Sequence, residues 1–231
     1  MKKDILKKIL SKYYLGGRIE ENTIIVDKDG LVIPFHTDDV QMGGVIRYPD
    51  IILSQNLPIY NTGFFLKNLT LLSEDIDVEY KSNYINVSDD KFLIQIQLAD
   101  AEAISSYEKM LSYKEEEYFL DFDIDYVFIK DFLSACDIYK STKDNNFSIK
   151  RIREGLLFSF GDYSKISFNK KLSIKSVDNF DNYYKTDIFA DILKVNKEFD
   201  NASFHMSKNT IKLNFNSDSI NSTYYIVKQD V

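Results

Sequence analysis

One order of predicted elements occurs twice in this chain: a helix, a hairpin, further strands, a second helix and three strands. The two halves also match locally at an offset of 126 residues, as in the pairs Ile85/Ile211 and Val87/Leu213. Because apolar alternation is common to all half-buried strands, the repeated order weighs more than these pairs. The pattern therefore predicts an α+β fold made of one duplicated module, in which two helices pack on antiparallel sheets.

Apolar residues spaced three and four apart predict the helices. The first helix spans Asp4 to Tyr14, and Gly16 and Gly17 follow it as a stop signal. The others span residues 62–72, 128–140 and 186–196. Asn61 stands where an N-cap belongs, and Asp187 contributes to the start of the last helix.

Alternating apolar residues and turn signals predict the strands. The turn Asp27-Lys28-Asp29-Gly30 and the pair Glu154-Gly155 mark two hairpins. In the first half the strands cover residues 23–26, 31–36, 44–48, 76–80, 84–87 and 92–98. In the second half they cover residues 147–153, 156–160, 165–174, 202–206, 210–215 and 222–227.

The negative charge of the chain is concentrated in one segment between the two halves. Nine acidic and two basic residues lie between Leu98 and Asp125, a balance of −7, and the net charge of the whole chain is also −7. The remainder therefore sums to zero, and the acidic total does not exclude nucleic acid as a partner. We expect a first module over residues 1–100, an acidic connector over 101–125 and a second module over 126–231.

No catalytic, metal or cofactor site can be assembled from the sequence. Cys136 is the single cysteine, and His36 and His205 lie in separate modules. The phosphate-binding patterns GxxxxGK[ST] and GxGxxG are absent. Asp121, Asp123 and Asp125 alternate and could bind a divalent cation, but a solvated acidic face explains them more simply. We expect no enzyme activity, no metal and no cofactor.

The sequence gives no sign of a membrane segment. The N-terminal residues lack the apolar stretch and cleavage site of a signal peptide, and no apolar run is long enough to cross a bilayer. We therefore expect a cytoplasmic protein without membrane contact.

Three segments and the order of elements resemble the processivity-clamp superfamily. Tyr224–Val231 and Glu117–Leu133 resemble the last strand with its tail, and the exit from the interdomain connector, of eukaryotic proliferating cell nuclear antigen. Leu57–Asp89 resembles the end of the first domain in trimeric clamps of tailed phages. The resemblance implies a homotrimeric ring that encircles duplex DNA, with a DNA polymerase and a clamp loader as partners. A phage origin would place it in the host cytoplasm.

In such a ring the helices line a hole that must attract phosphates without fixing the DNA in one position. Lysines suit this role because they act as mobile point charges. The lysines that would face DNA are Lys7, Lys8, Lys12, Lys67, Lys130, Lys140, Lys143, Lys194 and Lys197. On the first helix, Lys7, Lys8 and Lys12 are expected opposite the apolar face. The alternative is that these are ordinary solvated faces of a lysine-rich chain.

The resemblance also implies a surface that takes apolar and aromatic side chains of partner peptides. The matching positions are Val40, Tyr118, Phe119, Leu120, Val227 and Lys228. Plain core packing is the alternative role for Leu120 and Val227. For the whole chain, the alternative function is a non-enzymatic viral structural or host-interaction protein with a duplicated α+β fold, and an enzyme of unknown type is a third.

Overall fold

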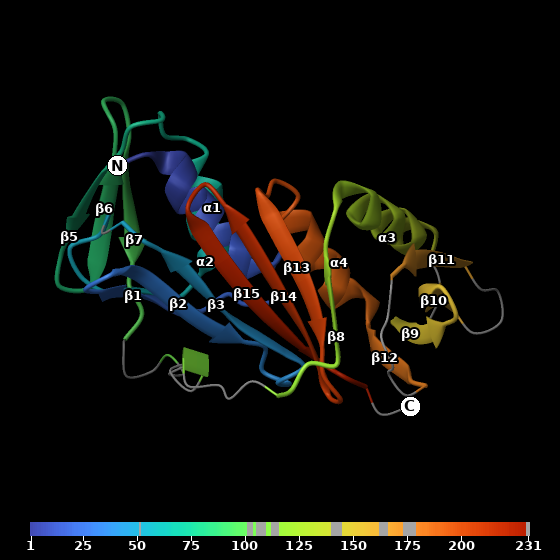
Figure 1. Ribbon diagram of the computed structural model, residues 1–231. Coiled ribbons are helices and arrows are strands. Elements are labelled where there is room, and N and C mark those ends of the chain that lie inside the picture. Colours follow the sequence, from blue (N-terminus) through green and yellow to red (C-terminus); the bar gives the residue numbers. More distant parts are fainter. Residues whose placement is uncertain are drawn as a thin grey trace. The chain divides into compact units, whose positions relative to one another are not determined.

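The chain folds into two compact units of helices and antiparallel strands (Figure 1). The structure, a computed structural model, describes residues 1–50, 52–100, 104, 110–111, 116–139, 145–161, 166–172 and 179–229. Unit 1 comprises Met1–Asp38, Gly43–Tyr113 and Asp218–Ser222. Unit 2 comprises Asp39–Met42, Lys114–Ser217 and Thr223–Val231.

Unit 1 contains two helices, a four-strand run and a three-stranded sheet. Its elements are α1 (Lys3–Tyr14), β1 (Asn22–Asp27), β2 (Gly30–His36), β3 (Met42–Tyr48), β4 (Leu57–Ile59), α2 (Thr62–Leu69), β5 (Asp77–Tyr80), β6 (Tyr84–Ser88) and β7 (Leu93–Gln97). The four-strand run has the order β4-β1-β2-β3, and the other sheet has the order β5-β6-β7. Asp27 pairs with Gly30, so the predicted turn joins β1 to β2 as a tight hairpin.

The two helices of unit 1 lie side by side (Figure 1). The Tyr13 hydroxyl of α1 lies 2.8 Å from the Thr62 hydroxyl at the start of α2, and both groups are buried. The predicted cap is confirmed, because the Asn61 side chain accepts a hydrogen bond from the Phe64 N–H at 2.7 Å. These contacts fix where α2 begins and how it meets α1.

Unit 2, together with the first residues of β15, repeats the order of elements found in unit 1 after one additional strand, β8. Its elements are β8 (Leu120–Asp123), α3 (Tyr126–Tyr139), β9 (Asn146–Ile152), β10 (Gly155–Phe160), β11 (Ile166–Lys171), β12 (Asp181–Lys185), α4 (Thr186–Val195), β13 (Asn201–Met206), β14 (Thr210–Ser217) and β15 (Ile220–Val227). The order β12-β9-β10-β11 reproduces β4-β1-β2-β3, and β13-β14-β15 reproduces β5-β6-β7. The duplicated α+β module is therefore confirmed.

The core of unit 2 is largely aromatic, although its topology matches that of unit 1. Phe132 of α3 lies 4.5 Å from Phe189 of α4 and 4.9 Å from Phe147 of β9, between ring centroids. Phe158 and Phe168 stack on neighbouring strands at 5.0 Å. These rings hold α3 and α4 against the four-stranded sheet, because edge-to-face and offset-stacked pairs are the favoured aromatic contacts.

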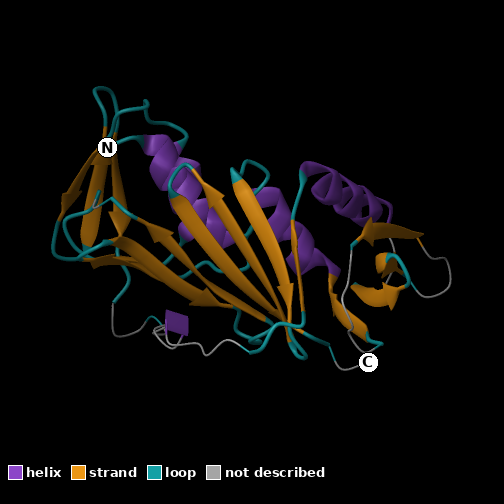
Figure 2. Cartoon of the chain, viewed as in Figure 1, coloured by secondary structure: helices purple, strands orange, loops and turns teal. Residues whose placement is uncertain are grey.

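The sequence predicted every helix and all the longer strands, within a few residues, but missed three short strands (Figure 2). β4, β8 and β12 have three to five residues each. β8 lies within the predicted acidic connector, yet its residues pair with β13, as Phe122 does with Phe204. Short strands carry too few apolar positions for a periodic signal.

Candidate functional site

The first helix presents two of its three predicted DNA-facing lysines to solvent. The side chains of Lys7 and Lys8 are partly exposed. Lys12 is only 3 % exposed, so its expected position opposite the apolar face is wrong. The apolar face of α1 is wider than its periodicity suggests, and a lysine stem can bury along such a face while its ammonium reaches a charged partner.

An aspartate from a distant part of the sequence pairs with Lys8 and also feels the charge of Lys12. Asp218 forms an ion pair with the Lys8 ammonium. The pKa of the Asp218 carboxyl lies below its usual range because of the hydrogen bond from Lys8 and the charges of Lys8 and Lys12. The exposed ammonium of Lys8 is thus already paired with a carboxylate, and the Lys12 ammonium acts on the same carboxylate.

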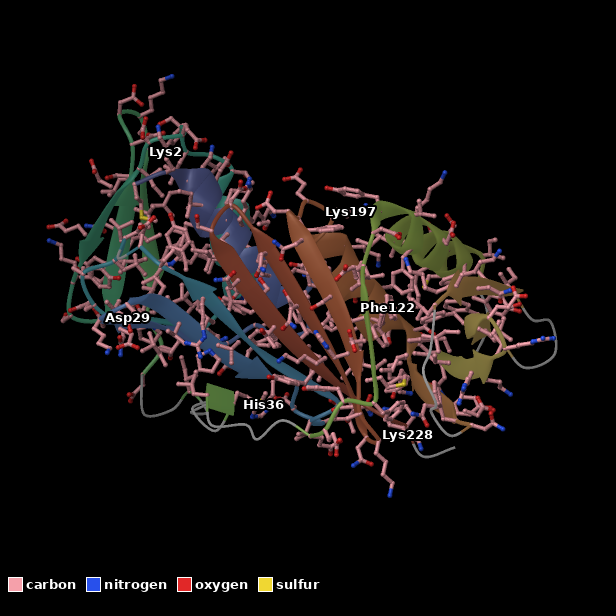
Figure 3. All side chains as sticks on the ribbon, viewed as in Figure 1. Lys2, Asp29, His36, Phe122, Lys197 and Lys228 are labelled. Atoms are coloured by element: carbon pink, nitrogen blue, oxygen red, sulfur yellow. The ribbon has the colours of Figure 1, made fainter. Side chains whose placement is uncertain are left out.

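The other helices also carry exposed lysines. Lys67 on α2, Lys130 on α3 and Lys194 on α4 are exposed, and Lys197 lies just beyond α4 (Figure 3). Lys194 forms an ion pair with Asp191 at 2.7 Å, one turn earlier on the same helix. Asp131 and Asp137 share the exposed surface of α3 with Lys130. Lys140 and Lys143 lie outside the described residues.

One edge of the predicted partner surface is formed by a loop and the end of the last strand. Val40 is 64 % exposed and Val227 is 38 % exposed. The Val227 N–H donates to the Gln41 carbonyl at 2.9 Å, so the loop lies directly beside the end of β15. Lys228 follows the strand (Figure 3), and its N–H donates to the Asn209 carbonyl at 2.8 Å.

The connector residues of the predicted surface run along β13. The Phe119 N–H donates to the Met206 carbonyl at 3.0 Å. Tyr118 and Phe119 are half-buried, whereas Leu120 is 6 % exposed and belongs to the core. The Lys212 ammonium lies 5.7 Å from the Tyr118 ring centroid, within cation–π range. The surface in this part of unit 2 is therefore apolar and aromatic with basic side chains beside it.

A carboxylate fixes the start of this connector segment to the β13–β14 turn. Glu116 accepts hydrogen bonds from the Asn209 amide at 2.9 Å and from the Ser207 hydroxyl at 2.5 Å. These bonds hold the pKa of Glu116 below its usual value, and the bond from Asn209 has the largest effect. Asn209 also binds Lys228 through its carbonyl, so one turn positions both the connector and the residue after the last strand.

The remaining chemistry-bearing residues are engaged in local structure. Among the described residues, no three His, Cys, Asp or Glu side chains gather as metal ligands would. Asp125 does not continue the row of Asp121 and Asp123, because it caps α3 by accepting from the Phe128 N–H at 2.7 Å. Cys136 is buried, as expected. No helix within the described ranges is long and apolar enough to span a membrane.

Sequence spacing could have found only some of these contacts. The pair Asp191 and Lys194 has the i,i+3 spacing that places two residues on one helix face. Asp218 lies 210 residues from Lys8, so nothing local in the sequence connects them. Likewise, 93 residues separate Glu116 from Asn209.

No protein-family model matches the sequence, and no curated protein matches it. Several solved structures match its fold. A structure of the C-terminal region of FEN-1 bound to A. fulgidus PCNA aligns with a TM-score of 0.78 at 15% identity, over 100% of this chain and 97% of that one. Proliferating cellular nuclear antigen from Entamoeba histolytica aligns with a TM-score of 0.75 at 12% identity, over 99% and 96%.

A PCNA2–PCNA3 complex from Sulfolobus tokodaii aligns with a TM-score of 0.73 at 14% identity, over 99% of this chain and 97% of that one. The agreement extends over nearly the whole length of all three structures, so it includes both units and both copies of the module. The chain therefore has the two-domain fold of the PCNA sliding clamps.

Proposed function

We propose that the chain is a subunit of a ring-shaped sliding clamp that encircles duplex DNA and tethers a DNA polymerase and other replication proteins. The observation that carries this proposal is the PCNA fold over the full chain, with the strand order of its module repeated. The likeness to PCNA clamps also favours a binding protein over an enzyme.

DNA contact is assigned to the exposed lysines of the helices. Lys7, Lys67, Lys130 and Lys197 have no ion-pair partner within the described ranges, so their ammonium groups are available to phosphates. Lys8 and Lys194 are already paired with aspartates, which compete with phosphates for their ammonium groups. Lys140 and Lys143 remain part of the proposal, whereas buried Lys12 is left out. Contacts of this type are insensitive to sequence, as sliding requires.

Partner peptides are assigned to the surface around Val40, Tyr118, Phe119, Val227 and Lys228, with Leu120 as the core residue beneath it. The matching solved structure with FEN-1 supports a peptide-binding role for this fold. The polymerase and the clamp loader would then compete for one surface on each subunit.

The ring is proposed to be a homotrimer closed by edge strands of neighbouring subunits. Among the described residues, β7 is an outer strand of the three-stranded sheet and β11 an outer strand of the four-stranded sheet. Unpaired strand edges of this kind accept a strand from another chain. The division into residues 1–100, 101–125 and 126–231 likewise stays a prediction.

Two measurements test the proposal. Native mass spectrometry should give a particle of three times 27.0 kDa, or about 81 kDa. For topology, a linear duplex is bound to beads by one end, and the free end is capped with a bulky protein after the clamp has threaded on. The clamp should stay bound at high salt until a restriction enzyme cuts the duplex. A monomer at micromolar concentration, or equal loss from capped and open duplexes, would contradict the proposal.

A further inference from the structure

A tight turn holds an aspartate beside Lys8 of α1, on the surface proposed to face DNA. Two residues, Asp218 and Ser219, join β14 to β15, and their φ angles are 47° and 66°. Positive φ at both central residues is the mark of a two-residue hairpin turn that matches the strand twist. Asp tolerates this conformation well. The backbone therefore fixes the Asp218 carboxylate beside α1.

In this position the carboxylate acts on two lysines of one helix. Lys8 pairs with it directly, and the charge of Lys12 also favours its ionised form. Lys8 would otherwise contribute positive charge to the surface proposed to face phosphates. The turn instead supplies a negative charge that reduces the potential there.

The second module also contains a helix lysine paired with an aspartate, but there the two residues are close in the sequence. On α4, Asp191 holds the ammonium of Lys194 at 2.7 Å, and the side chain of Lys194 is 40 % exposed. The two aspartates reach their lysines by different routes, one across 210 residues and one across a single helical turn. A helix of each module thus presents a lysine that already has an anionic partner.

A paired lysine contributes less to DNA binding than an unpaired one. The carboxylate already neutralises part of the charge of the ammonium, so a phosphate competes with it for the N–H donors, and the nearby carboxylate repels the DNA. Each lysine that neutralises a phosphate adds about 0.9 to the slope of log K against log salt concentration. Paired lysines therefore lower both the affinity and its salt dependence.

We propose, on the basis of the proposed function, that Asp218 competes with DNA phosphates for Lys8 and that Asp191 competes with them for Lys194. This competition limits the affinity of the ring for the duplex. The two aspartates are tuning residues of the DNA-facing surface. The ring can thus carry enough lysines to attract DNA, while few of them contact a phosphate at any moment. Few simultaneous contacts favour sliding.

The test compares Asp218→Asn and Asp191→Asn with the wild type on a short open-ended duplex, by fluorescence anisotropy across a salt series. Asn is close in shape to Asp and also accepts positive φ, so the turn should persist. Each variant should steepen the salt slope by about 0.9 and lower the Kd in 0.1 M salt by about eightfold. Melting temperatures show that the variants are folded.

Two controls isolate the cause. Asp181→Asn changes the net charge equally but breaks a pair on strands, that of Lys150 with Asp181 at 2.6 Å, and it should leave the slope unchanged. Adding Lys8→Gln to Asp218→Asn should abolish most of the gain, because the gain passes through Lys8.

The outcomes separate this inference from the proposed function. If the wild type is retained on capped duplex but the aspartate variants bind with the wild-type salt slope, the inference is wrong. The proposed clamp function is then still supported. An equal gain in Asp181→Asn also overturns it, since net charge alone would then explain the change. If the wild type escapes equally from capped and open duplexes, the proposed function itself fails.

Discussion

Lys8 of α1 and Asp218 form an ion pair across 210 residues of sequence. It ties the first helix of the chain to the turn that precedes the last strand. The pair is exposed, so its contribution to folding stability is small, as is usual for surface ion pairs. Its importance lies in the charge that it removes from a helix surface proposed to meet DNA.

Lys7→Glu should weaken DNA binding more than a change at a paired lysine would. The Lys7 ammonium has no anionic partner within the described ranges, so under the proposed function its reversal removes one full phosphate contact and adds repulsion. We expect a salt slope lower by about 0.9 and a Kd at least about eightfold higher in 0.1 M salt. The readout is anisotropy on a short duplex, with Lys28→Glu in the exposed β1–β2 turn as control. Equal binding by both variants would remove α1 from the interface.

Val227→Glu should block partner peptides without changing the oligomer. Val227 is 38 % exposed beside the loop that carries Val40, and a carboxylate there would be desolvated by an apolar peptide side chain. The probe is a fluorescent peptide rich in apolar and aromatic residues, selected by display against the wild-type chain. Its Kd should rise about tenfold or more, equivalent to about 1.4 kcal/mol.

Tyr60→Glu is the matched control for this surface, because Tyr60 is 61 % exposed in unit 1. It should bind the peptide as the wild type does, and native mass should be unchanged in both variants. A peptide that binds Val227→Glu normally but fails on Tyr60→Glu would move the partner surface to unit 1.

Thr62→Val should destabilise unit 1, because it leaves the buried Tyr13 hydroxyl without its partner at 2.8 Å. It also removes the bond from the Thr62 hydroxyl to the Glu20 carbonyl. We expect a loss of about 1–3 kcal/mol in the free energy of unfolding by urea. Adding Tyr13→Phe should cost less than the sum of the two single changes, because the pair is lost only once. Strict additivity would show that the two hydroxyls do not interact.

Asp125→Ala should destabilise unit 2 at neutral pH but not in acid. Burial opposes ionisation of Asp125, but the Lys170 ammonium at 2.6 Å and the Phe128 N–H outweigh it, so the pKa of its carboxyl lies below the usual value. A lowered pKa gives stability that is present above the unfolded value near 4 and lost as pH falls through the folded value.

The measurement for Asp125 is the urea midpoint of wild type and variant at pH 7 and at pH 2. Loss of the cap should lower the free energy of unfolding by about 1 kcal/mol at pH 7. The gap should narrow in acid, as the wild-type carboxyl takes up a proton. Asp131→Ala, on the exposed face of the same helix, should change little at either pH. A gap that persists at pH 2 would mean that Asp125 acts through packing and not through its charge.

The sequence by itself determined the order of elements, the repeat of the module and the fold class, because these depend on apolar spacing within a few residues. The spacing of Phe189 and Ile192 is enough to predict α4, and Asn61 is enough to predict a cap. The sequence did not predict the short strands β4, β8 and β12. They have too few apolar positions for a periodic signal, and they form because they pair with strands elsewhere in the chain.

Only the tertiary structure decided which lysines of α1 are buried and which are paired with a carboxylate. The spacing of Lys8 and Lys12 describes two exposed cations, whereas packing buries one of them and brings Asp218 from the far end of the chain to the other. Periodicity records which side of a helix is apolar, but the width of the buried face and the charges across from it are set by whatever the fold packs there. Electrostatic partners at long sequence separation therefore leave no local signal, and they appear only when the chain is folded.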